Sequence, residues 1–142
     1  MKAVQLFALE SHSGPYDKWP LRTRLLIDGK LSPILIPGYI LLCQFKIDDG
    51  YLLVTDCDCP YEETTSFILL SNDMKLISYK MLFVLYGSFN FESIAWINSQ
   101  YAQVTFWKND IWNLRIRKFD IPYLLPRLIL QRHGQTKEDA KT

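Results

Sequence analysis

Cysteine, glycine and histidine are scarce in this chain, and each shortage excludes a class of protein. The three cysteines, Cys43, Cys57 and Cys59, form no even disulfide framework, so the sequence favours free thiols in a reducing cytoplasm. Six glycines and seven prolines among 142 residues exclude collagen-like and low-complexity chains. The two histidines, His12 and His133, lie near the ends of the chain and offer few ligands for a metal centre.

Long apolar runs are absent as well. The longest stretches without a charge, Leu31–Phe45 and Ser93–Trp107, are 15 residues each and are interrupted by proline or amide residues. A membrane-spanning helix needs about 20 apolar residues. The first ten residues lack a signal-peptide core and are typical of a first strand. We therefore expect a cytoplasmic protein with no membrane association.

Net charge is also small, at +1, so a general affinity for nucleic acid is not expected. The charges are nevertheless distributed unevenly. Between Ile47 and Met74 there is no lysine or arginine, but there are seven acids: Asp48, Asp49, Asp56, Asp58, Glu62, Glu63 and Asp73. Between Lys108 and Arg132, bases outnumber acids. Arg115 and Arg117 alternate with Trp112, which places the arginines opposite the indole and argues against a nucleic-acid stacking platform.

What the chain does have is apolar alternation with a period of two. Residues Trp112, Leu114 and Ile116 share one face of a strand, and Arg115 and Arg117 share the other. The same period recurs between turn signals such as Asp-Gly, which supply the positive φ angles that tight hairpins need. Strands are expected over these ranges: 22–27, 31–36, 39–47, 51–57, 66–70, 75–82, 93–97, 101–106, 111–118 and 127–133.

The sequence therefore predicts an all-β fold, an antiparallel meander of about nine or ten strands forming a sandwich or barrel. One domain is expected over residues 1–133, followed by a flexible tail over 134–142. Several runs, including Phe67–Leu70, are apolar on both faces, which is typical of central strands that are covered twice. In the strand over 39–47 the alternation places Tyr39, Leu41, Cys43, Phe45 and Ile47 on one face.

The densest polar cluster, Thr55–Thr65, lies between two apolar strands and is expected to be a loop that carries function. Three kinds of chemistry are open to it. A metal site would use Cys57 and Cys59, but their spacing is not that of zinc ligands, and the calcium-loop pattern is missing. A hydrolase or metal-dependent enzyme centred on Asp56–Glu63 would use paired carboxylates, yet no catalytic motif accompanies them.

The third possibility is binding through charge, and it is the hypothesis that the sequence favours. We expect a non-enzymatic protein-binding module without metal or cofactor, for example one of the bacterial immunity type that neutralises a toxin domain. A partner with a basic surface would contact an acidic surface with an aromatic anchor, formed by Asp56, Asp58, Tyr61, Glu62 and Glu63. A further alternative is a small-molecule-binding β-barrel with a cavity lined by Phe45, Trp96, Phe106 and Trp112.

Overall fold

The computed structural model describes residues 1–58, 62–85, 91–117 and 127–133. Within these residues the chain forms twelve strands and two short 3₁₀ helices. In chain order the elements are β1 (Lys2–Ala3), β2 (Phe7–Leu9), η1 (Tyr16–Lys18), β3 (Thr23–Ile27), β4 (Lys30–Ile36), β5 (Ile40–Ile47), β6 (Gly50–Asp58), β7 (Glu62–Ser71), β8 (Leu76–Leu85), β9 (Phe91–Asn98), β10 (Tyr101–Phe106), η2 (Trp107–Asn109), β11 (Asp110–Ile116) and β12 (Leu128–Arg132).

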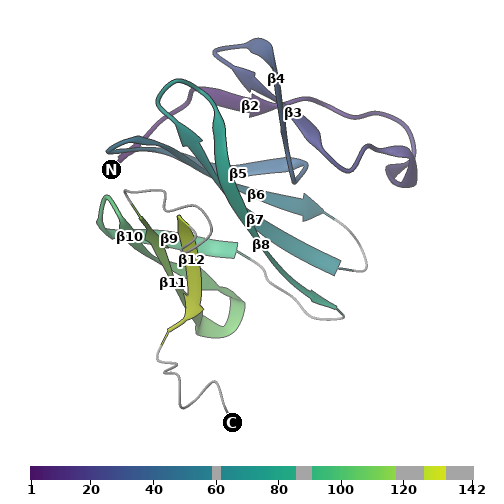
Figure 1. Ribbon diagram of the computed structural model, residues 1–142. Coiled ribbons are helices and arrows are strands. Elements are labelled where there is room, and N and C mark those ends of the chain that lie inside the picture. The colour runs from purple at the N-terminus through teal and green to yellow at the C-terminus, as the bar shows by residue number, and fades with distance from the viewer. Residues whose placement is uncertain (59–61, 86–90, 118–126, 134–142) are drawn as a thin grey trace.

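The strands form three antiparallel sheets, which Figure 1 shows as separate groups. A central sheet has the order β1-β5-β6-β7-β8, a four-stranded sheet has the order β12-β11-β10-β9, and a three-stranded sheet has the order β2-β3-β4. The prediction of an all-β antiparallel fold is confirmed. The prediction of a single meander is wrong, and no closed barrel forms among the described strands, because hydrogen bonding stops between β4 and β5 and between β8 and β9.

Tight turns form where the sequence signals them. Asp28 and Gly29 adopt φ angles of 52° and 79° between β3 and β4, the left-handed geometry of a two-residue hairpin. Between β10 and β11 the chain turns through Lys108 and Asn109, with φ angles of 63° and 58°. These turn residues determine the hairpins within each sheet. How the three sheets pack together depends on contacts between their side chains.

The central sheet is buried on both faces, as the doubly apolar runs predict. Leu52 and Phe67 face a core shared with the four-stranded sheet. Leu53 and Ile68, which follow them directly in sequence, face a second core shared with the three-stranded sheet. All four side chains have no exposed surface. Successive strand residues point to opposite faces, so β6 and β7 supply two cores from one strand pair.

The four-stranded sheet has the expected inward and outward faces. Leu114 and Ile116 of β11 are buried in the first core together with Val104 and Phe106 of β10. Arg115 is exposed, and its guanidinium lies 4.7 Å from the centroid of the Tyr101 ring on the neighbouring strand. The alternation seen in the sequence therefore predicts this sheet well.

Strand β5 departs from the expected alternation. A bulge lies between Leu41, which pairs with Thr55, and Cys43, which pairs with Val54. The extra residue shifts the pleat by one position. Leu41 consequently packs in the core beneath the three-stranded sheet, while Cys43 packs in the other core. The prediction that Leu41 and Cys43 share a face is wrong for this reason.

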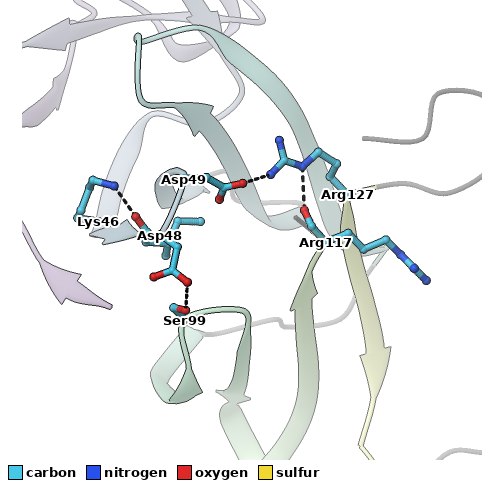
Figure 2. Close-up of polar contacts among 7 residues, drawn as sticks. Lys46, Asp48, Asp49, Ser99, Arg117 and Arg127 are labelled. Atoms are coloured by element: carbon cyan, nitrogen blue, oxygen red, sulfur yellow. Dashed lines mark hydrogen bonds and ion pairs between the residues drawn. The ribbon is translucent and has the colours of Figure 1, made fainter. Parts of the chain in front are cut away.

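Two acids in the β5–β6 turn tie the central sheet to the four-stranded sheet (Figure 2). Arg127 donates from Nη2 to Asp49 Oδ2 at 2.8 Å and from Nε to the Arg117 carbonyl at 2.9 Å. The Ser99 hydroxyl, in the β9–β10 turn, donates to Asp48 Oδ2 at 2.6 Å. The Arg127 side chain is only 10% exposed, whereas that of Asp49 is 41% exposed. This turn therefore holds the two layers in register.

Among the described residues, no helix has the length and apolar character needed to cross a bilayer. The predicted tail over 134–142 lies outside the described residues.

Candidate functional site

The seven acids of the segment 47–74 do not form one surface, because the strands carry them to two ends of the central sheet. The register pairs Gly50 with Ser71 at one end and Asp58 with Glu63 at the other. A nine-residue strand spans about 30 Å, at 3.4 Å per residue. One end holds Asp48, Asp49 and Asp73, and the other holds Asp56, Asp58, Glu62 and Glu63.

The first group is engaged in contacts within the chain. Asp48 and Asp49 form the contacts to the four-stranded sheet described above. Asp73 accepts a hydrogen bond from Ser71 and lies 3.7 Å from Lys75 Nζ. The hydrogen bond from the Ser71 hydroxyl is the main reason that the pKa of the Asp73 carboxyl is lowered. Only the second group remains as a candidate acidic surface.

The polar cluster Thr55–Thr65 is mostly strand, so the prediction of a loop over this range is wrong. β6 continues to Asp58 and β7 begins at Glu62, with Cys57 paired to Thr64 across the hairpin. Threonine suits a pleated strand, and the buried Thr55 donates its hydroxyl to the Pro37 carbonyl at 2.9 Å. A satisfied hydroxyl can be buried at low cost, which is why polar residues here extend the sheet.

The predicted binding residues lie at this hairpin end. Asp56 is half-buried, and its Oδ1 atom has almost no exposed surface, so it is not a fully solvated member of an acidic patch. The backbones of Asp58, Glu62 and Glu63 lie in the paired strands, whereas their side chains are outside the described part of the structure. Tyr61 lies outside the described residues, as does Cys59.

A pocket of about 460 Å³ opens beside the same hairpin. It is enclosed by the segment that includes η1, by the turn before β5, by β6 and β7, and by Met81 of β8. Most of its lining is apolar or aromatic. The lining residues are Tyr16, Asp17, Trp19, Leu21, Pro37, Gly38, Tyr39, Cys57, Thr64, Ser66 and Met81.

One wall of the pocket is a cluster of aromatic rings. The ring centroids of Tyr16, Trp19 and Tyr39 lie between 5.1 and 5.5 Å from one another, and the Tyr39 ring meets the other two edge-on. Each polar tip is held: the Tyr39 hydroxyl donates to the Pro20 carbonyl at 2.6 Å, and Trp19 Nε1 donates to the Gly14 carbonyl at 3.2 Å. The Tyr16 hydroxyl lies 3.0 Å from Cys57 Sγ. These bonds fix the wall before any ligand arrives.

The turn through Pro37 and Gly38 is fixed in the same way. The Thr23 hydroxyl donates to the Gly38 carbonyl at 2.7 Å. Gly38 has a φ of 101°, and a Cβ at this position would lie 2.3 Å from Thr55 Oγ1. Only glycine allows this turn to approach β6 so closely. Its conformation and its contacts therefore define one side of the pocket.

Two hydroxyl groups give the pocket its buried polar character. Ser66 is 1% exposed and Thr64 is 8% exposed, and both line the pocket. Each hydroxyl can donate one hydrogen bond and accept others. Buried polar groups in native proteins are nearly always hydrogen-bonded. The pair therefore marks a place where a ligand's polar group can bind.

The other kinds of chemistry find less support in the described geometry. In the described ranges, no group of three His, Cys, Asp or Glu residues is placed to hold a metal ion. Cys57 contacts Tyr16, and His12 lies 3.1 Å from the Thr23 hydroxyl. Burial raises the pKa of the Cys43 thiol to about 12, which keeps it protonated at neutral pH.

The four aromatic residues proposed to line a barrel cavity pack into the protein core. The Phe45 and Trp96 rings are in edge contact at 5.4 Å. Phe106 is fully buried, and Trp112 packs against the same core cluster. These four residues therefore belong to the packed core, and no closed barrel forms among the described strands.

Sequence reasoning missed the pocket because its lining comes from five separate parts of the chain. The available signal was Tyr16 and Trp19 within a Pro- and Gly-bounded segment, where large aromatics need a surface to cover. Comparisons of the chain with protein families, with curated proteins and with solved structures found no match.

Proposed function

We propose that this chain is a non-enzymatic protein-binding module that contacts a basic partner with the pocket and the adjoining end of the β6–β7 hairpin. The observation that carries the proposal is their adjacency. Cys57 and Thr64 line the pocket, and the backbones of Asp56, Asp58, Glu62 and Glu63 lie within two residues of them at the same end of the hairpin.

This combination matches the anatomy of protein interfaces. Binding energy concentrates in a few anchor side chains that fill well-packed pockets, and polar or charged residues surround them. Leu21 is 89% exposed and Met81 is 42% exposed, and both line the pocket. Apolar side chains left in water beside a preformed aromatic wall are a favourable surface for a partner to cover.

The acids at the hairpin end supply the second requirement, discrimination among partners. Negative residues around an apolar anchor site accelerate association with a basic protein and disfavour acidic ones. An immunity-type protein that masks the basic site of a toxin domain is one example of such a module, and nucleic acid is not an expected partner. The proposal retains the acidic residues and adds the pocket as the anchor.

Affinity capture from cells of the source organism tests the proposal, with wild-type protein compared with two variants. The double substitution Glu62→Lys and Glu63→Lys reverses charge at the hairpin end. Glu92→Lys is the matched control, since Glu92 is an exposed acid in β9 of the four-stranded sheet. We expect a partner with a basic surface that the wild type and the control retain and the double variant loses, most clearly at low salt.

Equal recovery of every captured protein by all three baits would refute the proposed interface. Melting temperatures of the variants should match that of the wild type, which separates lost binding from lost folding.

The pocket volume supports one alternative function, binding of a small apolar molecule. A volume of about 460 Å³ lies within the range of about 300–1,000 Å³ that is common for such sites. Native mass spectrometry of protein purified without detergent tests this alternative. A stoichiometric bound molecule that is lost in Trp19→Ala would favour it, and a mass equal to that of the bare chain would count against it.

A further inference from the structure

We infer that the anchor entering the pocket is an arginine side chain of the protein partner, with its guanidinium stacked on the aromatic wall and hydrogen-bonded to the hydroxyls of Thr64 and Ser66. This inference rests on the proposed function and names the chemistry that the pocket selects. Three independent features of the described residues support it.

The first feature is the pair of buried hydroxyls. Ser66 and Thr64 lie two residues apart on β7, so both point to the same face of the strand and into the same pocket. An aliphatic or unsubstituted aromatic anchor would cover these hydroxyls and offer them no hydrogen bond. A guanidinium carries five N–H donors in a fixed planar fork and can satisfy both oxygens at once.

The second feature is the aromatic wall. Tyr16, Trp19 and Tyr39 are held in place by hydrogen bonds from their polar tips, so their ring faces are preorganised. The face of an aromatic ring attracts cations, and the planar guanidinium also stacks on it. The chain already shows this contact nearby, where the Arg22 guanidinium carbon lies 4.7 Å from the centroid of the Tyr79 ring.

The third feature is charge. Among the described lining residues, Asp17 is the one acid, and there is no lysine or arginine. Arg22, which follows the lining residue Leu21, donates from Nη2 to the Tyr79 hydroxyl at 2.6 Å and is not itself a lining residue. Asp17 lines the pocket, is exposed, and makes no ion pair within the described residues. A cation entering the pocket would find an acceptor for its charge in Asp17.

Titration with two small probes, followed by ¹⁵N NMR, tests the inference. N-acetyl-arginine amide carries the guanidinium, and N-acetyl-citrulline amide has nearly the same shape without the charge. We expect saturable shifts of the Trp19 indole and of the Gly38 and Thr64 amides with the arginine probe, with citrulline binding about tenfold more weakly, as expected for loss of a charged hydrogen bond.

Ser66→Ala is the decisive variant because we expect it to weaken binding of the arginine probe without destabilising the fold. Ser66→Ala removes one pocket hydroxyl and introduces no larger side chain, so the melting temperature should change little while the affinity for the arginine probe falls about fivefold or more. Ser78→Ala is the matched control. The Ser78 hydroxyl is buried and has no partner among the described residues, but Ser78 does not line the pocket, so this variant should bind like the wild type.

Equal affinity for the two probes, equal affinity of Ser66→Ala and wild type, or shifts confined to other surfaces would each overturn the arginine assignment. Failure of the proposed function is a separate result. If capture of the partner still depends on Glu62 and Glu63 when the probes fail, the interface stands and its anchor is not arginine.

Discussion

The contact between Arg127 and Asp49 should be one of the strongest polar interactions between the two layers. Replacing Asp49 by Asn leaves a guanidinium that is only 10% exposed without its counter-ion. Removing one partner of a fully buried pair costs about 3–5 kcal/mol, whereas exposed pairs contribute about 0–1 kcal/mol. Because Asp49 is 41% exposed, we expect an intermediate loss, on the order of 1.5–3 kcal/mol.

Urea denaturation of a double-mutant cycle measures this contribution. The cycle combines Asp49→Asn and Arg127→Met, and the predicted coupling free energy is about 1–2 kcal/mol. Arg127→Met also removes the donor to the Arg117 carbonyl, so the single variants should not be equal. In thermal unfolding, a loss of 2 kcal/mol corresponds to a melting temperature lower by about 4–8 °C for a chain of this size.

A second pair in the same molecule provides the control. Arg132 and Asp110 lie 3.1 Å apart, but their side chains are 45% and 28% exposed. Their coupling should be about 0.2–1 kcal/mol and should fall with added salt, whereas the coupling of Arg127 and Asp49 should change little. A coupling between Arg127 and Asp49 no larger than that of the control pair would refute the argument from burial.

Three further predictions concern the cores and the pocket. Gly38→Ala should destabilise the fold by about 2–5 kcal/mol in urea denaturation, because the new Cβ meets Thr55 and the φ of 101° disfavours alanine; a loss below 1 kcal/mol would contradict the close approach. Leu52→Ala and Leu53→Ala should each cost about 2–5 kcal/mol, since both faces of β6 are buried; a negligible cost for either would mean that one face is open. In a variant whose sole thiol is Cys43, iodoacetamide at pH 8 should label unfolded protein and leave folded protein almost unlabelled, since the folded pKa of about 12 leaves little thiolate; equal rates would contradict this.

Local features of the fold were accessible from the sequence. The alternation of Trp112, Leu114 and Ile116 with Arg115 predicted the inner and outer faces of β11, and Asp28-Gly29 predicted the hairpin turn between β3 and β4. Both depend on neighbours along the chain, where side-chain period and turn geometry act directly. The doubly apolar run Phe67–Leu70 even indicated a central strand covered on both faces, which is confirmed.

Non-local features were not accessible in the same way. The sequence does not show that β4 and β5, or β8 and β9, belong to different sheets. Which strands pair depends on packing across the whole domain. The bulge at Leu41–Cys43 is invisible to a count of alternate residues. The seven acids looked like one surface because they are close in sequence, yet the hairpins carry them to opposite ends of the central sheet.

The candidate site has one part that the sequence predicts and one part that it does not. The acids from Asp56 to Glu63 were identified by composition, but the pocket beside them depends on Trp19 and Tyr39 meeting from segments 20 residues apart. The two large aromatic residues of the segment before β3, Tyr16 and Trp19, indicated that their rings pack over another part of the chain. What they cover, and that Thr64 and Ser66 lie beneath, required the three-dimensional arrangement.

Hydrogen–deuterium exchange on the complex with the captured partner shows which surface the partner covers. We expect slower exchange in residues 16–22, 37–39 and 64–66, with the outer face of the four-stranded sheet unchanged. Protection confined to β9–β12, with the pocket segments exchanging as in the unbound protein, would contradict it.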